Sequence, residues 1–275
     1  MNTNIYMLEK EWLEHKMITR VPLALLICGV VFLFSIIMNS SIQSNVTYEL
    51  TYSGGFDSNF ELGKQLSHLV FGFAGILSLI LSGLYFPKTL RKERQEGSLM
   101  FWRSMPVSDV QVHLVKLCFG LLVVPVICSV LVFGADFLMW GINLAVGDKF
   151  PLFSTGESVL YVFTNWLEFI GRMWLIGFAL IPMATLSLAV SQKVNSPLLV
   201  ILVALFVIQL LSKSLLGIHG IGHFIEAASL LPFELLTVDN PFSAFANMGL
   251  INLLVYVALG ALGWVMSLRF AKYVD

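Results

Sequence analysis

The sequence predicts an all-α polytopic membrane protein that forms one transmembrane domain over residues 1–275. The chain is 57% hydrophobic and 12% charged, which is about half the charged fraction of an ordinary soluble domain. Apolar runs recur along it, each about 20 residues long and able to cross a ~30 Å hydrocarbon core as a helix. The basic residues gather beside alternate runs, as the positive-inside rule requires of a multi-pass protein.

Six transmembrane helices are expected. Their ranges are 21–38, 66–87, 111–135, 172–190, 197–217 and 248–268. Pro87 is expected to end the second helix. Ser108 and Gln111 match the S-x-x-Q capping box and predict the start of the third. The polar turn 192–197 joins the fourth and fifth helices into a hairpin.

The charge distribution predicts that both termini are cytoplasmic. The N-terminus, the segment 88–110, the turn 191–196 and the C-terminus are assigned to one side of the membrane. That side then holds twelve basic residues, which are Lys10, Lys16, Arg20, Lys88, Arg91, Lys92, Arg94, Arg103, Lys116, Lys193, Arg269 and Lys272. The other side holds three, which are Lys64, Lys149 and Lys213, and Arg172 lies at the outer interface. This bias predicts an integral plasma (inner) membrane protein with its N- and C-termini inside. With a net charge of −1 and no basic face, a nucleic-acid partner is excluded.

Residues 4–20 predict an amphipathic helix that lies in the cytoplasmic interface. Ile5, Leu8 and Trp12 share one helical face, and the charged residues Glu9, Lys10, Glu14 and Lys16 lie elsewhere around the helix. A Trp at this position suits the headgroup region of a bilayer. The alternative is an ordinary helix that faces solvent.

Two outer segments carry candidate polar sites. Residues 157–171 extend the fourth helix beyond the length of one straight crossing, so a bend near Gly171 is expected. Glu168 and Arg172 then form an i,i+4 pair at the outer interface, either functional or an anchor. His219, His223 and Glu226 could meet on a helix, but three nearby glycines weaken that helix and no metal site is predicted. The rest of 218–247 resembles a short re-entrant or surface-lying segment.

The stretch 91–109, "RKERQEGSLMFWRSMPVSD", lies between the second and third helices and predicts a short helix over 94–105 that Pro106 closes. Its aromatic, acidic and basic residues allow two interpretations. The helix could lie on the inner leaflet with its basic residues toward anionic lipid. It could instead dock into a groove of a cytosolic partner, with Phe101 and Trp102 as anchors.

The order "KERQEGSLMFWRSMPVSDVQVHLVKL" resembles the type-2 ATP-binding-cassette (ABC) transporter permeases. The matching positions are Glu96, Gly97, Leu99, Pro106, Val107, Ser108 and Lys116. The N-terminal "LEKEWLEHK" is similar to the interfacial elbow helix of that family, with Leu8, Glu11 and Trp12 among its residues. Many members carry a second acid three residues after the Gly, where this chain has Met100. An acidic contact to a partner is therefore in doubt.

The resemblance implies an ABC exporter permease whose loop is a coupling helix seated in a separate ABC ATPase subunit. The coupling residues would be Glu96, Gly97, Leu99, Phe101, Trp102, Arg103 and Pro106. A second permease copy or a paralogue would complete a dimer in the lipid bilayer. ATP and Mg would bind to the ATPase, because the permease chain itself binds no cofactor and lacks a G-x-x-x-x-G-K-[ST] motif.

Other functions are weighed against this one. A membrane-embedded enzyme would need a nucleophile with its base, or paired metal ligands, within the spans, and the sequence has no such motif. An ion-coupled transporter, or a structural membrane partner without an ATPase, is the remaining alternative. Ion coupling usually needs buried acids, and only Asp136 and Glu168 lie near the spans. The apolar spans suit an apolar or amphipathic cargo.

Overall fold

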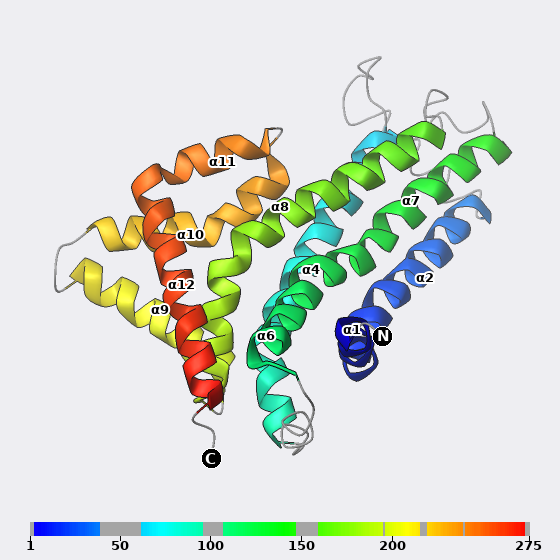
Figure 1. Ribbon diagram of the computed structural model, residues 1–275. Helices are drawn as coiled ribbons and strands as arrows, with labels where there is room; N and C mark the ends of the chain where they lie inside the picture. The colour runs from blue at the N-terminus through cyan, green and yellow to red at the C-terminus, as the bar shows by residue number, and fades with distance from the viewer. Residues whose placement is uncertain are drawn as a thin grey trace. The chain divides into compact units, whose positions relative to one another are not determined.

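The computed structural model describes residues 3–38, 62–95, 107–146, 159–194, 196–214, 219–238 and 240–272, and these ranges contain no β-strand. The predicted all-helical class is confirmed (Figure 1). The helices are α1 (Thr3–Glu14), α2 (Lys16–Met38), α4 (Leu62–Gln95), α6 (Asp109–Cys118), the π-helical turn η1 (Phe119–Val123), α7 (Val124–Val146), α8 (Val159–Ser191), α9 (Pro197–Ser214), α10 (His219–Thr237), α11 (Pro241–Met248) and α12 (Leu250–Lys272).

Four described helices are long and apolar enough to cross a membrane. They are Gln65–Glu93, Asp109–Ile142, Val159–Ser191 and Leu250–Lys272, and α1 with α2 adds a fifth if the two count as one broken span. The predicted fifth span corresponds to α9, whose apolar part, Leu199–Ser212, is shorter than a full crossing. The six-span count therefore stays a prediction.

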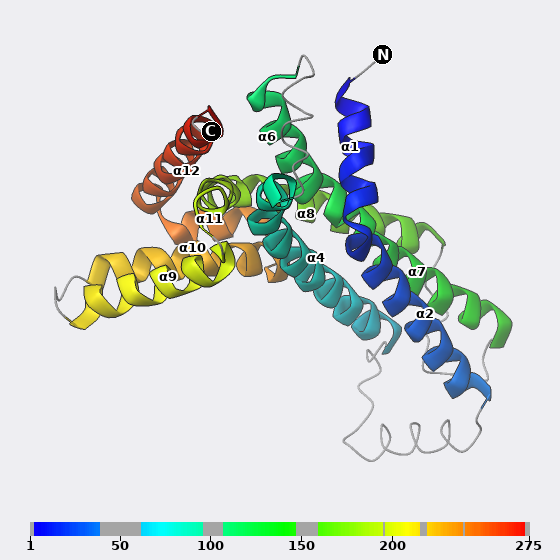
Figure 2. The ribbon, with the colours of Figure 1, turned by 90° about the horizontal axis from the view of Figure 1, so that it is seen from below.

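The chain forms two compact units. One contains Met1–Glu14, Ser78–Pro125 and Arg172–Asp275, and the other contains His15–Leu77 and Val126–Gly171. In the first unit, α10 packs against α9, α11 and α12 (Figure 1). In the same unit α1 lies beside α6 (Figure 2).

The second predicted span does not end at Pro87, so this prediction is wrong. Helix α4 continues to Gln95. Proline removes one backbone hydrogen bond from a helix, but the turns that follow it are held by packing. Thr89, Leu90 and Glu93 are all buried. This tertiary burial outweighs the local cost of the proline.

The third predicted span begins as expected. Ser108 caps α6, and both hydrogen bonds of the capping box with Gln111 are present. A π-helical turn then precedes Pro125, and in it Val124 donates its N–H to the carbonyl of Phe119, five residues back. In the same five-residue pattern, the donor to the Gly120 carbonyl would be the backbone nitrogen of Pro125. A proline nitrogen carries no hydrogen, so this hydrogen bond cannot form. Ser82 Oγ donates a 2.7 Å hydrogen bond to that carbonyl instead.

Helix α8 is continuous from Val159 to Ser191, and the bend near Gly171 stays a prediction. The outer segment 218–247 is largely helical, because α10 begins at His219 despite its glycines and Asn240 caps α11. Gly249 joins α11 to α12 with φ of +79°, a conformation that a side chain would strain.

Helices α8 and α12 meet at glycine positions in the first unit. A Cβ on Gly260 would lie 2.6 Å from Cα of Pro182, and one on Gly263 would lie 2.9 Å from the backbone N of Leu186. Thr185 Oγ1 also donates a 2.9 Å hydrogen bond to the Gly260 carbonyl. Small residues of this kind allow helix backbones in a membrane to approach closely.

We expect Gly260→Ala to lower the free energy of unfolding by about 1–3 kcal/mol, because the obstructing atoms belong to backbone and a proline ring. Gly141→Ala is the matched control, since a Cβ there would meet nothing within 4 Å. Denaturant unfolding in mixed micelles measures both variants. Equal stability of the two would refute the close α8–α12 contact.

Candidate functional site

The N-terminal helix buries a polar side chain at the centre of its contact with the rest of the first unit. Glu11 is 2% exposed, and Met7, one turn earlier, is also buried. Ile5 and Trp12, from the predicted apolar face, are exposed. The helix therefore turns its Met7–Glu11 face inward and leaves an apolar face outside, as an interfacial helix would.

Glu11 forms an ion pair with Lys116 of α6. The Lys116 Nζ lies 2.6 Å from Glu11 Oε1 and 3.1 Å from Glu93 Oε1 of α4. Lys116 is 1% exposed and Glu93 is 5% exposed. Because buried charges are costly unless paired and hydrogen-bonded, this geometry fixes α1, α4 and α6 against one another.

Helix α4 supplies two further hydrogen bonds to Glu11. Tyr85 Oη donates a 2.6 Å hydrogen bond to Glu11 Oε2, and Thr89 Oγ1 donates one of 3.3 Å to the same atom. Lys116 Nζ also donates a 2.8 Å hydrogen bond to Thr89 Oγ1. Tyr85, Thr89 and Glu93 are spaced four residues apart, so they lie on one face of α4.

Lys10 extends the cluster toward solvent. Its Nζ lies 2.6 Å from Glu93 Oε1 and 3.4 Å from Glu14 Oε1. Lys92 Nζ donates a 3.3 Å hydrogen bond to the Glu14 carbonyl. We call Lys10, Glu11, Tyr85, Thr89, Glu93 and Lys116 the buried ion network.

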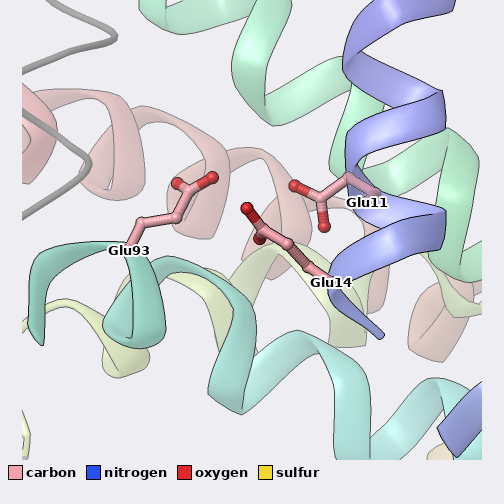
Figure 3. A group of neighbouring side chains, drawn as sticks. All are labelled: Glu11, Glu14 and Glu93. Carbon is pink, nitrogen blue, oxygen red and sulfur yellow. The ribbon is translucent and has the colours of Figure 1, made fainter. Parts of the chain in front are cut away.

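Three carboxylates of this region point toward one another (Figure 3). Oxygens of Glu11, Glu14 and Glu93 lie within 4.8 Å of one another, close enough to resemble metal ligands. Two ammonium groups, those of Lys10 and Lys116, contact these same carboxylates. Each of the three carboxylates therefore contacts a lysine, and we assign the cluster as an ion-pair network.

The network holds both ends of the predicted coupling loop. Helix α4 ends at Gln95, two residues after Glu93, and α6 begins at Asp109, seven residues before Lys116. The predicted coupling residues, Glu96, Gly97, Leu99, Phe101, Trp102, Arg103 and Pro106, lie outside the described residues. Any force on that loop reaches α4 and α6 at positions that the network joins to α1.

A second polar contact joins α6, the end of α8 and α12. His113 Nε2 lies 2.9 Å from Ser267 Oγ, and Gln192 Nε2 donates a 2.9 Å hydrogen bond to the same oxygen. The His113 ring meets Trp264 edge to face. The start of α6 is thus tied to the C-terminal helix as well as to α1.

The predicted outer pair lies on α8, where Glu168 and Arg172 are four residues apart. Arg172 Nη1 donates a 2.7 Å hydrogen bond to the Val238 carbonyl. This contact fixes the segment between α10 and α11 to α8. The Glu168–Arg172 ion pair stays a prediction.

Sequence reasoning identified only part of the network. Glu11 was assigned to the interfacial helix and Lys116 to the family pattern, but Tyr85, Thr89 and Glu93 were missed. A lysine inside an apolar run is itself a signal, because such a charge needs a partner. The four-residue spacing of Tyr85, Thr89 and Glu93 crosses Pro87. A helix that ends at Pro87 would not place these three residues on one face.

No protein-family model matches this chain, and no curated protein or solved structure matches it either.

Proposed function

We propose that this chain is the membrane-spanning permease subunit of an ATP-driven ABC exporter. It moves an apolar or amphipathic cargo, and a separate ATPase subunit binds ATP and Mg. A second permease copy or a paralogue completes the transport path. The observation that carries the proposal is the buried ion network, which joins α1 to both helices that flank the loop 96–106.

The network suits the transmission of movement. A docked ATPase moves the loop, and with it the end of α4 and the start of α6. Because separating Lys116 from Glu11 and Glu93 takes both carboxylates away from a buried ammonium group, α1 moves with them instead of detaching. An ATP-driven change at the loop thereby displaces α1, α4 and α6 together. The three helices then act as a two-state element whose equilibrium ATP binding shifts.

The loop supplies the surface for the partner. Phe101 and Trp102 are large aromatic anchors, and Glu96 and Arg103 provide charges at the rim. The sequence contains no phosphate-binding loop of its own. A partner that hydrolyses ATP therefore belongs to the proposed mechanism.

Affinity purification of the tagged chain from its native membrane in mild detergent tests the proposal. We expect a separate ATPase subunit to co-purify in equal amount, and to be lost with Trp102→Ala. Trp174→Ala is the matched control, since Trp174 is an exposed tryptophan on α8. The absence of an ATPase under several detergents would contradict the proposal and favour an ion-coupled or structural membrane protein.

A further inference from the structure

The second compact unit contains a buried acid where α4, α7 and α8 meet. Asn165 Nδ2 donates a 2.6 Å hydrogen bond to Asp136 Oδ2 and one of 3.1 Å to Ser67 Oγ. Tyr161 Oη donates a 3.3 Å hydrogen bond to the same serine oxygen. All three helices contribute to candidate membrane spans, and the contacting residues lie within about two turns of the span ends.

This carboxylate is buried, and no lysine or arginine side chain that the structure describes is paired with it. Asp136 is 3% exposed, Ser67 is 1% exposed and Asn165 is 8% exposed. No described ammonium or guanidinium group lies within ion-pair distance of Asp136, and its Oδ1 atom has no hydrogen-bond partner among the described residues. An ionised carboxylate in such a place is costly unless a positive charge neutralises it.

Among the described side chains, none supplies that charge by an ion pair. Asp136 is the only charged residue in the sequence of α7. On α4 His68 is exposed and the side chain of Lys64 lies outside those described, and on α8 Tyr161 is engaged with Ser67 and Glu168 is exposed. Helix α2 carries Lys16 and Arg20 at the end opposite Met38. The contrast with the first unit is direct, because there every buried carboxylate of the ion network contacts a lysine.

We propose that Asp136 binds a single small positive charge, either a proton or an alkali-metal ion, between α4, α7 and α8. Asp136 Oδ1 is the primary ligand, and Asn165 positions the carboxylate by holding Oδ2. Asp136, Ser67 and Asn165 are all buried, so only a small ligand fits beside the carboxylate. Neutralisation of Asp136 stabilises the contact of the three helices. The inference is independent of the proposed ATPase partner.

Labelling with a hydrophobic carbodiimide tests the proposal on the wild-type chain. This reagent modifies protonated carboxyl groups, and mass spectrometry locates the adduct. At neutral pH, without sodium or potassium, we expect Asp136 to be labelled and the exposed Glu226 to remain unlabelled. Suppression by sodium or potassium chloride, but not by N-methylglucamine chloride, identifies an alkali ion, and insensitivity to all three salts identifies a proton. An unlabelled Asp136 in the sodium- and potassium-free medium would overturn the proposal.

Thermal unfolding in detergent provides a second test. The melting temperature of the wild type should rise with the ligand that the labelling identifies, and Asp136→Asn should abolish that rise. Glu226→Gln, which removes an exposed carboxylate, should keep it. The same rise in Asp136→Asn as in the wild type would contradict the assignment. If Asp136→Asn fails to fold, the wild-type labelling decides alone.

Discussion

Lys116→Met is expected to destabilise the protein by about 3–5 kcal/mol, which is the usual cost of removing one partner from a buried ion pair. Lys116 contacts both Glu11 and Glu93. Its loss removes the ammonium group that contacts Glu11, while the hydroxyl groups of Tyr85 and Thr89 still donate to that carboxylate. Denaturant unfolding in mixed micelles measures the change in free energy. Lys272→Met, which removes an exposed lysine at the end of α12, is the matched control.

A double variant separates the ion pair from the packing of the lysine stem. The double variant Glu11→Gln/Lys116→Met removes both charges. Its loss of unfolding free energy should be smaller than the sum of the losses in the two single variants. The difference is the interaction energy of the pair. Additive effects, or a Lys116→Met cost no larger than that of Lys272→Met, would contradict the assigned network.

Trp102→Ala and Glu96→Lys are expected to uncouple ATP hydrolysis from transport. Trp102 is the proposed anchor of the loop, and truncating such an anchor commonly costs about 2 kcal/mol or more of binding energy, or at least a tenfold loss in affinity. Glu96→Lys reverses a charge at the rim. Both variants should still insert into the membrane, because the predicted spans are unchanged.

Reconstitution of this chain with the proposed ATPase subunit in lipid vesicles measures this uncoupling. The readouts are the amount of ATPase bound per chain and the ratio of transport of an apolar or amphipathic probe to ATP hydrolysis. Trp174→Ala serves again as the control for loss of an exposed tryptophan. Normal binding and normal coupling of hydrolysis to transport in both loop variants would contradict the docking assignment.

The positions of most helices were predictable from local sequence. Hydropathy located α2, α4, α7 and α12, and the Ser108–Gln111 capping box gave the start of α6. The end of α4 was not predictable in this way. Its last turns depend on the burial of Thr89, Leu90 and Glu93, and that burial comes from elements distant in sequence.

The candidate site depended even more on long-range contacts. Glu11 and Lys116 are separated by 105 positions, and Tyr85 and Glu11 by 74. Charge alone identified Lys116 as unusual, but it did not identify its partners. Asp136 was noted as an acid near the outer boundary, whereas its contacts with Asn165 and Ser67 required the three-dimensional structure.

The central claim is that the loop 96–106 contacts a cytosolic ATPase. A photo-crosslinking amino acid placed at position 102 tests it most directly in native membranes, with the same group at position 174 as the control. We expect a crosslink from position 102 to one soluble ATPase subunit and no crosslink to it from position 174. Crosslinks from position 102 to lipid alone would contradict the account and identify the loop as a membrane-surface element.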